Sequence, residues 1–352
     1  MVVRLYPKKH DSTLLAKEIL ITGAAGFIGY HTSRRLCEAG MNVIGLDSLN
    51  DYYDVGLKRA RLKELEQYDN FRFYQIDISD KNKLDAIFNE NNIDVVVNLA
   101  AQAGVRYSLV NPYRYIESNV SGFMNILEAC RNNPVKHLVF ASSSSVYGAN
   151  NKVPFSVNDH TDHPISLYAA TKKANEAMAH SYASLYGIPC TGLRFFTVYG
   201  PWGRPDMAYF LFTDKIIHNK PIQLFNHGQL SRDFTYIDDI VKAIVALIDK
   251  PPVASPHKAG QTLDTSDSFA PYKLYNIGHN KPVQLMEFVQ VLENLLGKKA
   301  ILEYKPMQAG DMYETFADIE DLTASIGFSP QVDIKEGLKH FVDWYKKYYN
   351  VV

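Results

Sequence analysis

The feature that most constrains the fold is a glycine pattern placed directly after a short apolar segment. EILIT at 18–22 predicts a buried strand, and GAAGFIG at 23–29 follows it and opens a helical pattern. Gly23, Gly26 and Gly29 permit a tight turn, close approach of a pyrophosphate and packing of the helix on the strand. The free N–H groups and the dipole of a helix N-terminus favour an anion there. The segment therefore predicts a dinucleotide-binding turn.

An acidic residue further along the chain supports this prediction. Asp47 ends the next predicted strand, NVIGLD, about 20 residues after the glycine pattern. A carboxylate at this place can accept hydrogen bonds from both ribose hydroxyls and would repel a 2′-phosphate, so the pattern favours NAD over NADP. A plain tight turn would also carry glycines, but it would not require the strand, the helix and Asp47 around them.

The chain up to residue 197 continues to alternate predicted strands with predicted helices. Such alternation is typical of a parallel sheet covered on both faces, so we expect an α/β fold with a Rossmann-like, doubly wound parallel sheet. After this point proline, glycine and aromatic residues crowd the sequence VYGPWGRPDM, and a smaller mixed α/β domain is expected. The expected division is an N-terminal extension at 1–17, an NAD-binding domain at 18–197 with a return near 233–250, and a mainly substrate-binding domain at 198–352.

Composition narrows the class of protein further. The formal net charge of −1 gives no reason to expect nucleic acid or an anionic membrane surface as a partner. No stretch has the roughly 18 apolar residues of a membrane span, and the N-terminal sequence lacks the pattern of a secretory signal, so a cytoplasmic location is expected. Cys37, Cys130 and Cys190 are widely spaced and predict buried free thiols rather than a disulfide framework or a metal site.

Four consecutive serines, Ser142 to Ser145, follow the predicted strand HLVFA. Composition alone would suggest a flexible patch, but sites in open α/β sheets lie at strand ends. Tyr168 and Lys172 stand four residues apart in YAATK and share one face of a predicted helix. A nearby ammonium, together with a positive nicotinamide ring, favours the phenolate and lowers a tyrosine pKa that is ordinarily about 10. An exposed helical pair is the alternative interpretation, but the nucleotide fold and the serines favour a site.

Together these motifs resemble the extended short-chain dehydrogenase/reductase family of nucleotide-sugar enzymes. The resemblance rests on GxxGxxG, Asp47, NLAAQAG, the serine run with VYG, the Tyr-Lys pair and RDFTYIDD, and it runs from about residue 18 to the end. It implies tightly held NAD, a catalytic triad of Ser143, Tyr168 and Lys172, and a C-terminal domain that holds a nucleoside diphosphate sugar.

The resemblance also implies the binding residues. Asp77 and Ile78 fall where the family contacts the adenine, and Asn119 falls where it steadies the active-site helix. The expected NAD contacts are Gly23, Gly26, Phe27, Ile28, Gly29, Asp47, Asn50, Asp77, Ile78, Leu99, Ala100, Ala101, Asn119, Ala141, Tyr168 and Lys172. The expected substrate contacts are Arg106, Ser143, Ser144, Ser145, Tyr168, Thr197, Arg204, Gln223, Arg232 and Asp311. No metal is expected.

The residues beside the triad favour one reaction within this family. Relatives that eliminate water usually carry an Asp-Glu pair at the triad hydroxyl, and decarboxylating relatives often carry a glutamate close to it. Ser144 and Ser145 stand at those places, so the simplest remaining chemistry is reversible hydride transfer at C4, an epimerisation with Tyr168 as the base. The segments at 193–210 and 101–108 resemble those of UDP-glucuronate 4-epimerases, which interconvert UDP-glucuronate and UDP-galacturonate.

A uronate substrate poses a chemical problem. Oxidation at C4 makes a β-keto acid, which loses carbon dioxide once its carboxylate stands perpendicular to the ketone. Ser144, Ser145 and Thr197 are expected to hold the carboxylate through charge-assisted hydrogen bonds. Arg106 and Arg204 are cationic candidates, and for each a structural ion pair is an equal alternative. A guanidinium clamp would hinder rotation of the sugar, so the alternative role of Arg204 is to orient a loop.

The resemblance places Arg232 at the diphosphate and Asp311 at the nucleoside ribose, whereas Gln308 replaces a second arginine of many relatives. A homodimer is implied through helices at 111–132 and 166–186, for which core packing is the alternative, and polysaccharide biosynthesis is the expected setting. Three other functions stay open. They are a 4-epimerase of UDP-N-acetylglucosamine or UDP-glucose, a decarboxylase that makes a UDP-pentose, and a dinucleotide-binding regulatory or scaffold protein.

Overall fold

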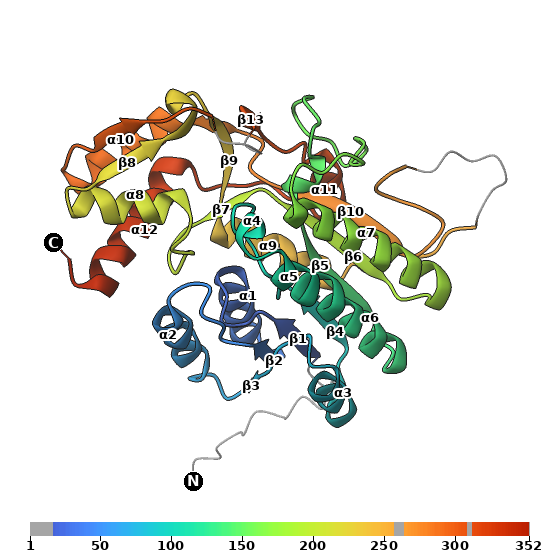
Figure 1. Ribbon diagram of the computed structural model, residues 1–352. Coiled ribbons are helices and arrows are strands. Elements are labelled where there is room, and N and C mark those ends of the chain that lie inside the picture. Colours follow the sequence, from blue (N-terminus) through green and yellow to red (C-terminus); the bar gives the residue numbers. More distant parts are fainter. Residues whose placement is uncertain (1–16, 257–263, 308–311, 352) are drawn as a thin grey trace, which may run out of the picture.

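A seven-stranded sheet forms the centre of the computed structural model, which describes residues 17–256, 264–307 and 312–351. The strand order is β10-β6-β5-β4-β1-β2-β3, and every neighbouring pair is parallel (Figure 1). The strands are β1 (Glu18–Thr22), β2 (Asn42–Asp47), β3 (Phe71–Gln75), β4 (Val95–Asn98), β5 (His137–Ser143), β6 (Cys190–Phe195) and β10 (Tyr272–Ile277). The predicted parallel sheet is therefore confirmed.

Helices cover both faces of this sheet, because successive side chains of a buried strand point to opposite sides. In β1, Ile19 and Ile21 pack into one core and Leu20 packs into the other. The first core contains helices α1 (Phe27–Glu38), α2 (Val55–Leu65) and α9 (Ile237–Ile248). The second contains α3 (Lys81–Glu90), α6 (Gly122–Asn132) and α7 (Leu167–Tyr186). The sheet is thus doubly wound, as the sequence predicts.

The remaining elements form a smaller mixed part (Figure 1). A four-stranded sheet contains β7 (Thr197–Tyr199), β9 (Ser231–Tyr236), β11 (Pro282–Gln284) and β13 (Glu314–Thr315). A second, two-stranded sheet pairs β8 (Pro221–Leu224) with β12 (Ile301–Tyr304). The longer helices of this part are α8 (Ala208–Ile217), α10 (Leu285–Leu296) and α12 (Ile334–Tyr349), and the short α11 (Glu320–Ile326) contacts β10. Aromatic rings of α12 pack on Phe210, so they serve the core.

The chain returns to the central sheet twice after residue 197. Helix α9 packs on α1, in the segment where the sequence predicts a return. Strand β10 pairs in parallel with β6, a second return that the sequence pattern does not predict. The division of the chain into two domains at residue 197 stays a prediction.

One predicted helix is interrupted. The sequence predicts a continuous helix over 111–132, but the structure has the short α5 (Pro112–Tyr115), a π-helical turn η1 (Ile116–Ser121) and then α6. The wider turn aims Asn119 at the loop after β4, where its Oδ1 accepts a hydrogen bond from the Gln102 N–H at 2.8 Å and its Nδ2 donates to the Gln102 carbonyl at 3.0 Å. Inserted π turns of this kind are frequent at functional sites.

Three expectations concern the cysteines, membrane-spanning helices and metal sites. Cys37, Cys130 and Cys190 are buried and free, as predicted. No helix within the described ranges has the length and apolar character to cross a membrane. These ranges also contain no group of three or more histidine, cysteine, aspartate or glutamate side chains that could hold a metal ion.

Candidate active site

A cavity of about 1040 Å³ lies along the carboxyl ends of the central strands, and residues of the smaller mixed part close its other side. Sites in open α/β folds lie at this edge of the sheet. Pockets for one small ligand usually measure about 300–1,000 Å³. The cavity is therefore as large as the largest of these pockets.

The glycine turn forms one end of the cavity and is shaped for an anion. Gly23 has a φ of +72°, and a Cβ on Gly29 would come within 2.0 Å of the Gly23 carbonyl oxygen. Gly26 is the N-cap of α1, no side chain caps the helix, and its first turn contains no acidic residue. The N–H groups and the dipole at this helix start are therefore available to a pyrophosphate. The residues fit the predicted dinucleotide.

The acidic residue of the predicted NAD site lies beside this turn. The Asp47 carboxylate accepts hydrogen bonds from the N–H groups of Ala25 at 3.1 Å and Leu49 at 2.8 Å. Burial raises the pKa of Asp47, although these bonds and the nearby Lys58 and Arg61 oppose the shift. Lys58, which is only 4% exposed, donates to the carbonyl and side-chain oxygens of Asn50 at 2.7 and 2.8 Å. Sequence reasoning missed Lys58.

A second buried cation, Arg61, joins the glycine turn to the segment at 202–203. Its guanidinium is fully buried and donates to the carbonyls of Ala25 at 2.8 Å, Trp202 at 2.6 Å and Gly203 at 3.1 Å. Among the described residues no carboxylate forms an ion pair with it. Sequence reasoning missed Arg61, although its four-residue spacing from Leu57 places it on the buried face of α2.

The structure brings the predicted triad together at the cavity. Ser143 is the last residue of β5, and its Oγ accepts a hydrogen bond from the Ser145 N–H at 3.2 Å. Helix α7 begins after Ser166, whose hydroxyl accepts a capping bond from the third helical residue at 3.1 Å. Tyr168 and Lys172 therefore lie in the first turns of α7, and both line the cavity with Ser143.

The ionisation of this triad differs from the sequence prediction. Burial raises the pKa of Tyr168, while the Ser143 hydroxyl and the Arg204 charge partly oppose the shift. Burial also lowers the pKa of Lys172 to about 8, and its Nζ donates to the Ala141 carbonyl at 2.8 Å. The lowering of the tyrosine pKa does not occur in the protein chain by itself, because desolvation of the phenolate outweighs the opposing groups. The lowering expected with the nicotinamide ring in place stays a prediction.

A buried ion pair fixes the strand end that carries the serines. Ser142 Oγ donates to Glu176 Oε1 at 2.7 Å, so this serine supports the strand end. Arg194 of β6 holds the same carboxylate with two hydrogen bonds of 2.8 and 3.0 Å, and both side chains are almost fully buried. Glu176 follows Lys172 by one helical turn, so the pair ties α7 to β5 and β6. Sequence reasoning missed Glu176 and Arg194, and no local motif marks them.

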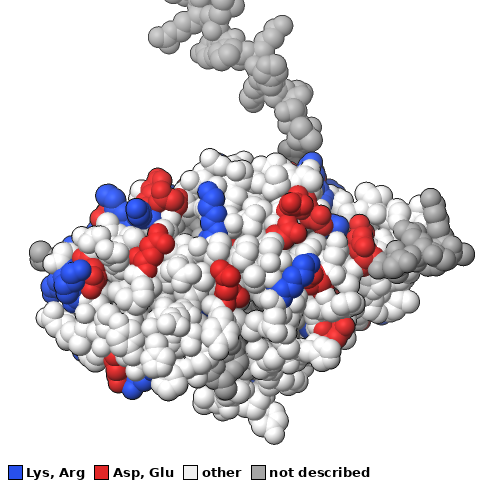
Figure 2. Space-filling model, turned by 90° about the horizontal axis from the view of Figure 1, so that it is seen from above, with Lys and Arg blue, Asp and Glu red and all other residues white. Residues whose placement is uncertain are grey.

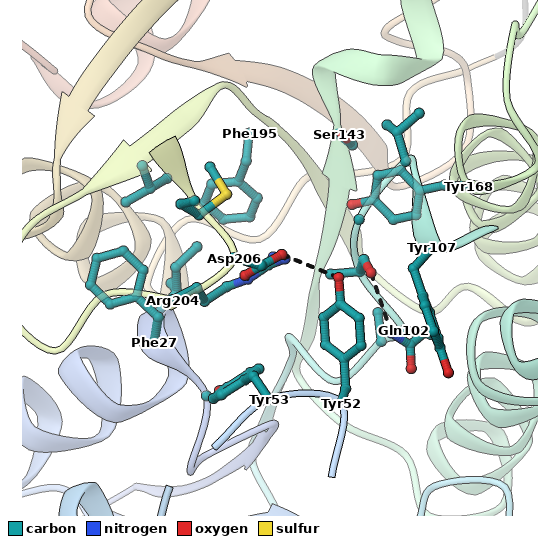
Figure 3. Close-up of a pocket in the computed structure, with 18 of the residues that line it drawn as sticks. Phe27, Tyr52, Tyr53, Gln102, Tyr107, Ser143, Tyr168, Phe195, Arg204 and Asp206 are labelled. Carbon is teal, nitrogen blue, oxygen red and sulfur yellow. Dashed lines mark hydrogen bonds and ion pairs between the residues drawn. The ribbon is translucent and has the colours of Figure 1, made fainter. Parts of the chain in front are cut away.

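The predicted sugar-side residues come from several elements. Ser144, Ser145 and Thr197 line the cavity near the triad. The Arg106 guanidinium lies 5.0 Å from the ring centre of Phe225. Arg204 lies beside Asp206 across the cavity from Ser143 and Tyr168 (Figure 3).

Two further predicted substrate residues, Gln223 and Arg232, lie on β8 and β9. The Gln223 amide donates to Glu303 at 3.2 Å, and Arg232 Nη1 donates to the Ser231 carbonyl at 2.8 Å. Both line the same cavity. Their side chains thus reach the cavity from the smaller mixed part of the fold.

With one exception, the predicted site residues that the structure describes line this cavity. The exception is Asn119, which lies behind the wall and bonds Gln102 and, at 3.1 Å, the hydroxyl of Thr171 on α7. Asp311 and Gln308 lie outside the described residues, as do residues 1–16 of the predicted extension. The predicted roles of these residues in binding stay predictions.

The cavity concentrates positive charge. The lysine and arginine side chains that line it are Lys58, Arg106, Lys172, Arg204, Lys215 and Arg232, and the acidic ones are Asp47, Asp77 and Asp206. The whole chain has a formal net charge of −1, and acidic and basic groups are interspersed on the face in Figure 2. A cleft with excess positive charge attracts anionic ligands, as a dinucleotide and a nucleoside diphosphate sugar both are.

Comparisons with known proteins show the family of the chain. The model of the NAD dependent epimerase/dehydratase family matches residues 19–261. Protein CapI of Staphylococcus aureus is 56% identical over 94% of this chain and 99% of its own length. A probable UDP-glucuronate 4-epimerase of Rhizobium meliloti is 48% identical over 94% of this chain and 97% of its own length.

A solved structure agrees at the level of the whole fold. It is that of the UDP-glucuronic acid 4-epimerase from Bacillus cereus in complex with UDP-glucuronic acid and NAD. The match has a TM-score of 0.83 at 32% identity and covers 94% of this chain and 100% of that one. On the family match and these similarities, the chain belongs to the NAD-dependent epimerase/dehydratase family.

Proposed function

We propose that the chain is an NAD-dependent 4-epimerase that interconverts UDP-glucuronate and UDP-galacturonate. One observation carries the choice of reaction. The cavity brings Ser143, Tyr168 and Lys172 together, and the positions beside the triad hydroxyl hold Ser144 and Ser145 rather than an acid. The similarity to UDP-glucuronate 4-epimerases over nearly the whole chain supports the choice of sugar.

The proposed chemistry is a reversible oxidation at C4 of the sugar. The glycine turn and Asp47 would hold NAD, which would supply the acceptor for the C4 hydride and its return. Tyr168 takes the proton of the C4 hydroxyl, and the Ser143 hydroxyl donates a hydrogen bond to the same oxygen as the ketone forms. The 4-keto sugar turns over in the cavity, and Tyr168 then returns the proton to the C4 oxygen on the other face.

The tyrosine must lose its proton for this step, although burial raises its pKa. The Ser143 hydroxyl and the Arg204 charge act in the required direction. A positive nicotinamide ring beside the phenol would act in the same direction. Lys172, held by the Ala141 carbonyl, adds an N–H donor at this side of the cavity.

The keto acid must also keep its carboxylate. In the proposal Ser144, Ser145 and Thr197 hold it in the plane of the ketone through short hydrogen bonds. Hydroxyl donors of this kind can be exchanged as the sugar turns. The lack of an acid beside the triad hydroxyl also removes the group that relatives use for elimination or decarboxylation.

A direct assay tests the proposal. The purified protein, incubated with UDP-glucuronate and without added NAD, is expected to form UDP-galacturonate, which proton NMR or chromatography separates from the substrate. Formation of only UDP-pentose and carbon dioxide would contradict it. So would turnover of UDP-N-acetylglucosamine or UDP-glucose with none of UDP-glucuronate.

The proposal extends to the setting of the enzyme. A homodimer through α6 and α7 is supported by the exposed apolar side chains of Met124, Leu185 and Tyr186 on these helices. A cytoplasmic location and a supply of UDP-galacturonate for polysaccharide biosynthesis belong to the same proposal.

A further inference from the structure

Arg204 is part of a three-residue chain on the sugar side of the cavity (Figure 3). Its Nε donates to Asp206 Oδ1 at 3.0 Å, and its Nη2 donates to Asp206 Oδ2 at 2.5 Å. The Tyr52 hydroxyl donates to the same Oδ2 at 3.1 Å. Tyr52 comes from the loop after β2, so the cofactor side of the fold takes part in placing an arginine of the sugar side.

We propose that Asp206 and Tyr52 are positioning residues that keep Arg204 from clamping the carboxylate of the sugar. The uronate carboxylate is then held by the hydroxyl donors and not by Arg204, and the 4-keto sugar is free to turn. The inference rests on the proposed function. It assigns to Asp206 and Tyr52 the role of letting the 4-keto uronate rotate in the site.

The geometry of the guanidinium carries the first step. Its Nε–Nη2 edge is one of the two edges that bind a carboxylate with two parallel bonds. Asp206 occupies both donors of that edge, and its negative charge also offsets the positive charge of Arg204. A sugar carboxylate can therefore reach only the Nη1–Nη2 edge, on an arginine whose charge is already paired.

The backbone of Arg204 is held by Tyr209, whereas its side chain is oriented by Asp206. The Arg204 N–H donates to the Tyr209 hydroxyl at 3.0 Å, and a Cβ on Gly203 would come within 2.3 Å of that hydroxyl. The backbone is thus fixed on its far side. The ion pair with Asp206 then determines where the guanidinium points.

Tyr52 is itself firmly placed. Its ring centre lies 4.9 Å from that of Tyr107, and a Cβ on Gly104 would come within 2.5 Å of its hydroxyl. Burial, followed by the charge of Asp206, raises the pKa of Tyr52 to about 12. The hydroxyl is therefore protonated at neutral pH and can donate to the carboxylate.

Release of Arg204 has a distinct kinetic signature. A free guanidinium would bind the substrate carboxylate with two bonds and stabilise one orientation of the sugar. Binding that stabilises the ground state and opposes the turn lowers KM and also lowers kcat. A merely structural defect would instead raise KM or leave it unchanged.

The test is the kinetics of Asp206→Asn with UDP-glucuronate. The variant is expected to lower KM severalfold and kcat by about tenfold, because one charge-assisted contact is commonly worth about a factor of ten. Tyr52→Phe is expected to lower KM and kcat as well, but by smaller factors than Asp206→Asn. The double variant is expected to match Asp206→Asn, since Tyr52 acts through Asp206. Inhibition by UDP, which has no sugar carboxylate, should be unchanged.

A matched control lies on the surface of the same chain. Glu38 accepts a hydrogen bond from Arg34 Nε at 2.9 Å and another from the Tyr68 hydroxyl at 3.1 Å. In this exposed group, as in the one around Arg204, an arginine and a tyrosine donate to one carboxylate. It lies outside the cavity. Glu38→Gln and Tyr68→Phe are expected to leave KM and kcat unchanged.

The outcomes separate the two proposals. A wild-type protein that does not turn over UDP-glucuronate contradicts the proposed function, and the inference falls with it. An active wild type whose Asp206→Asn variant has an unchanged or raised KM overturns the inference alone. If Asp206→Asn does not fold, a normal KM and kcat of Tyr52→Phe overturns it.

Discussion

At the scale of the residue, the phenol of Tyr168 combines two opposing environments. Burial raises its pKa, whereas the Ser143 hydroxyl and the charge of Arg204 favour the phenolate. A group in this situation holds its proton until other charges are placed beside it. Tyr168 is therefore suited to take a proton only when the cavity is filled.

The variant Tyr168→Phe removes the hydroxyl that accepts the proton and keeps the ring, so the volume of the side chain changes little. Turnover of UDP-glucuronate is expected to fall by at least about 10²-fold, as is usual when a general base is lost. Bound NAD should stay with the protein, because the glycine turn and Asp47 are unchanged. Initial rates and the NAD content after gel filtration measure the two effects, and near-normal turnover would contradict the proposed role.

The sequence identifies the site residues that belong to local motifs. The glycine turn, Asp47 and the Tyr-Lys pair each form a pattern within a few residues, and the structure brings them to one cavity. Arg61, Glu176 and Asp206 form no such pattern. Their partners lie on other elements or depend on the path of a loop, so only the fold reveals them.

At the scale of the element, His137 joins three parts of the fold. It lies on β5, its Nδ1 is 3.2 Å from the carbonyl oxygen of Ile248 at the end of α9, and its Nε2 is 2.8 Å from Thr191 Oγ1 on β6. The side chain is fully buried, and burial lowers its pKa to about 4. The folded protein therefore holds this histidine neutral at pH values where the unfolded chain protonates it.

This histidine gives the stability a defined pH dependence. Because its pKa is about 6.5 in the unfolded chain and about 4 in the folded one, the free energy of unfolding falls as the pH drops through this window. Between roughly pH 7 and pH 5, the free energy of unfolding of the wild type is expected to fall by about 2 kcal/mol more than that of His137→Gln. Urea unfolding at both pH values measures the difference, and equal losses in the two proteins would contradict the prediction.

The elements that sequence reasoning missed share a physical reason. The π turn η1 depends on the bonds of Asn119 to the backbone of Gln102, which is distant in the sequence. Strand β10 joins β6 only after the chain has passed through the smaller mixed part. Local periodicity predicts that a helix or a strand exists, whereas these features depend on contacts between distant segments.

At the scale of the whole molecule, the proposed dimer makes a direct prediction. Leu185 near the end of α7 is 68% exposed, and Tyr186 and Met124 are also exposed on the paired helices. Burying a leucine at an interface stabilises association, and a charge there opposes it. Sedimentation is expected to give twice the chain mass of 39.8 kDa for the wild type and a shift toward the monomer for Leu185→Glu.

A control for this prediction lies away from the two helices. Val253 is 84% exposed in the segment after α9, so Val253→Glu adds the same charge without touching the proposed interface. It should leave the mass unchanged. A monomeric wild type, or equal masses for all three proteins, would contradict the proposed dimer.

The buried guanidinium of Arg61 constrains how such a protein can change during evolution. One side chain satisfies backbone carbonyls of the glycine turn and of the segment at 202–203. An insertion or deletion in that segment would move its carbonyls and leave buried N–H donors without acceptors, which is costly. New sugar preferences should therefore arise by exchange of single side chains such as Thr197, while the length of this segment is kept. Grafting a whole loop from a distant relative would require a matching change on α2.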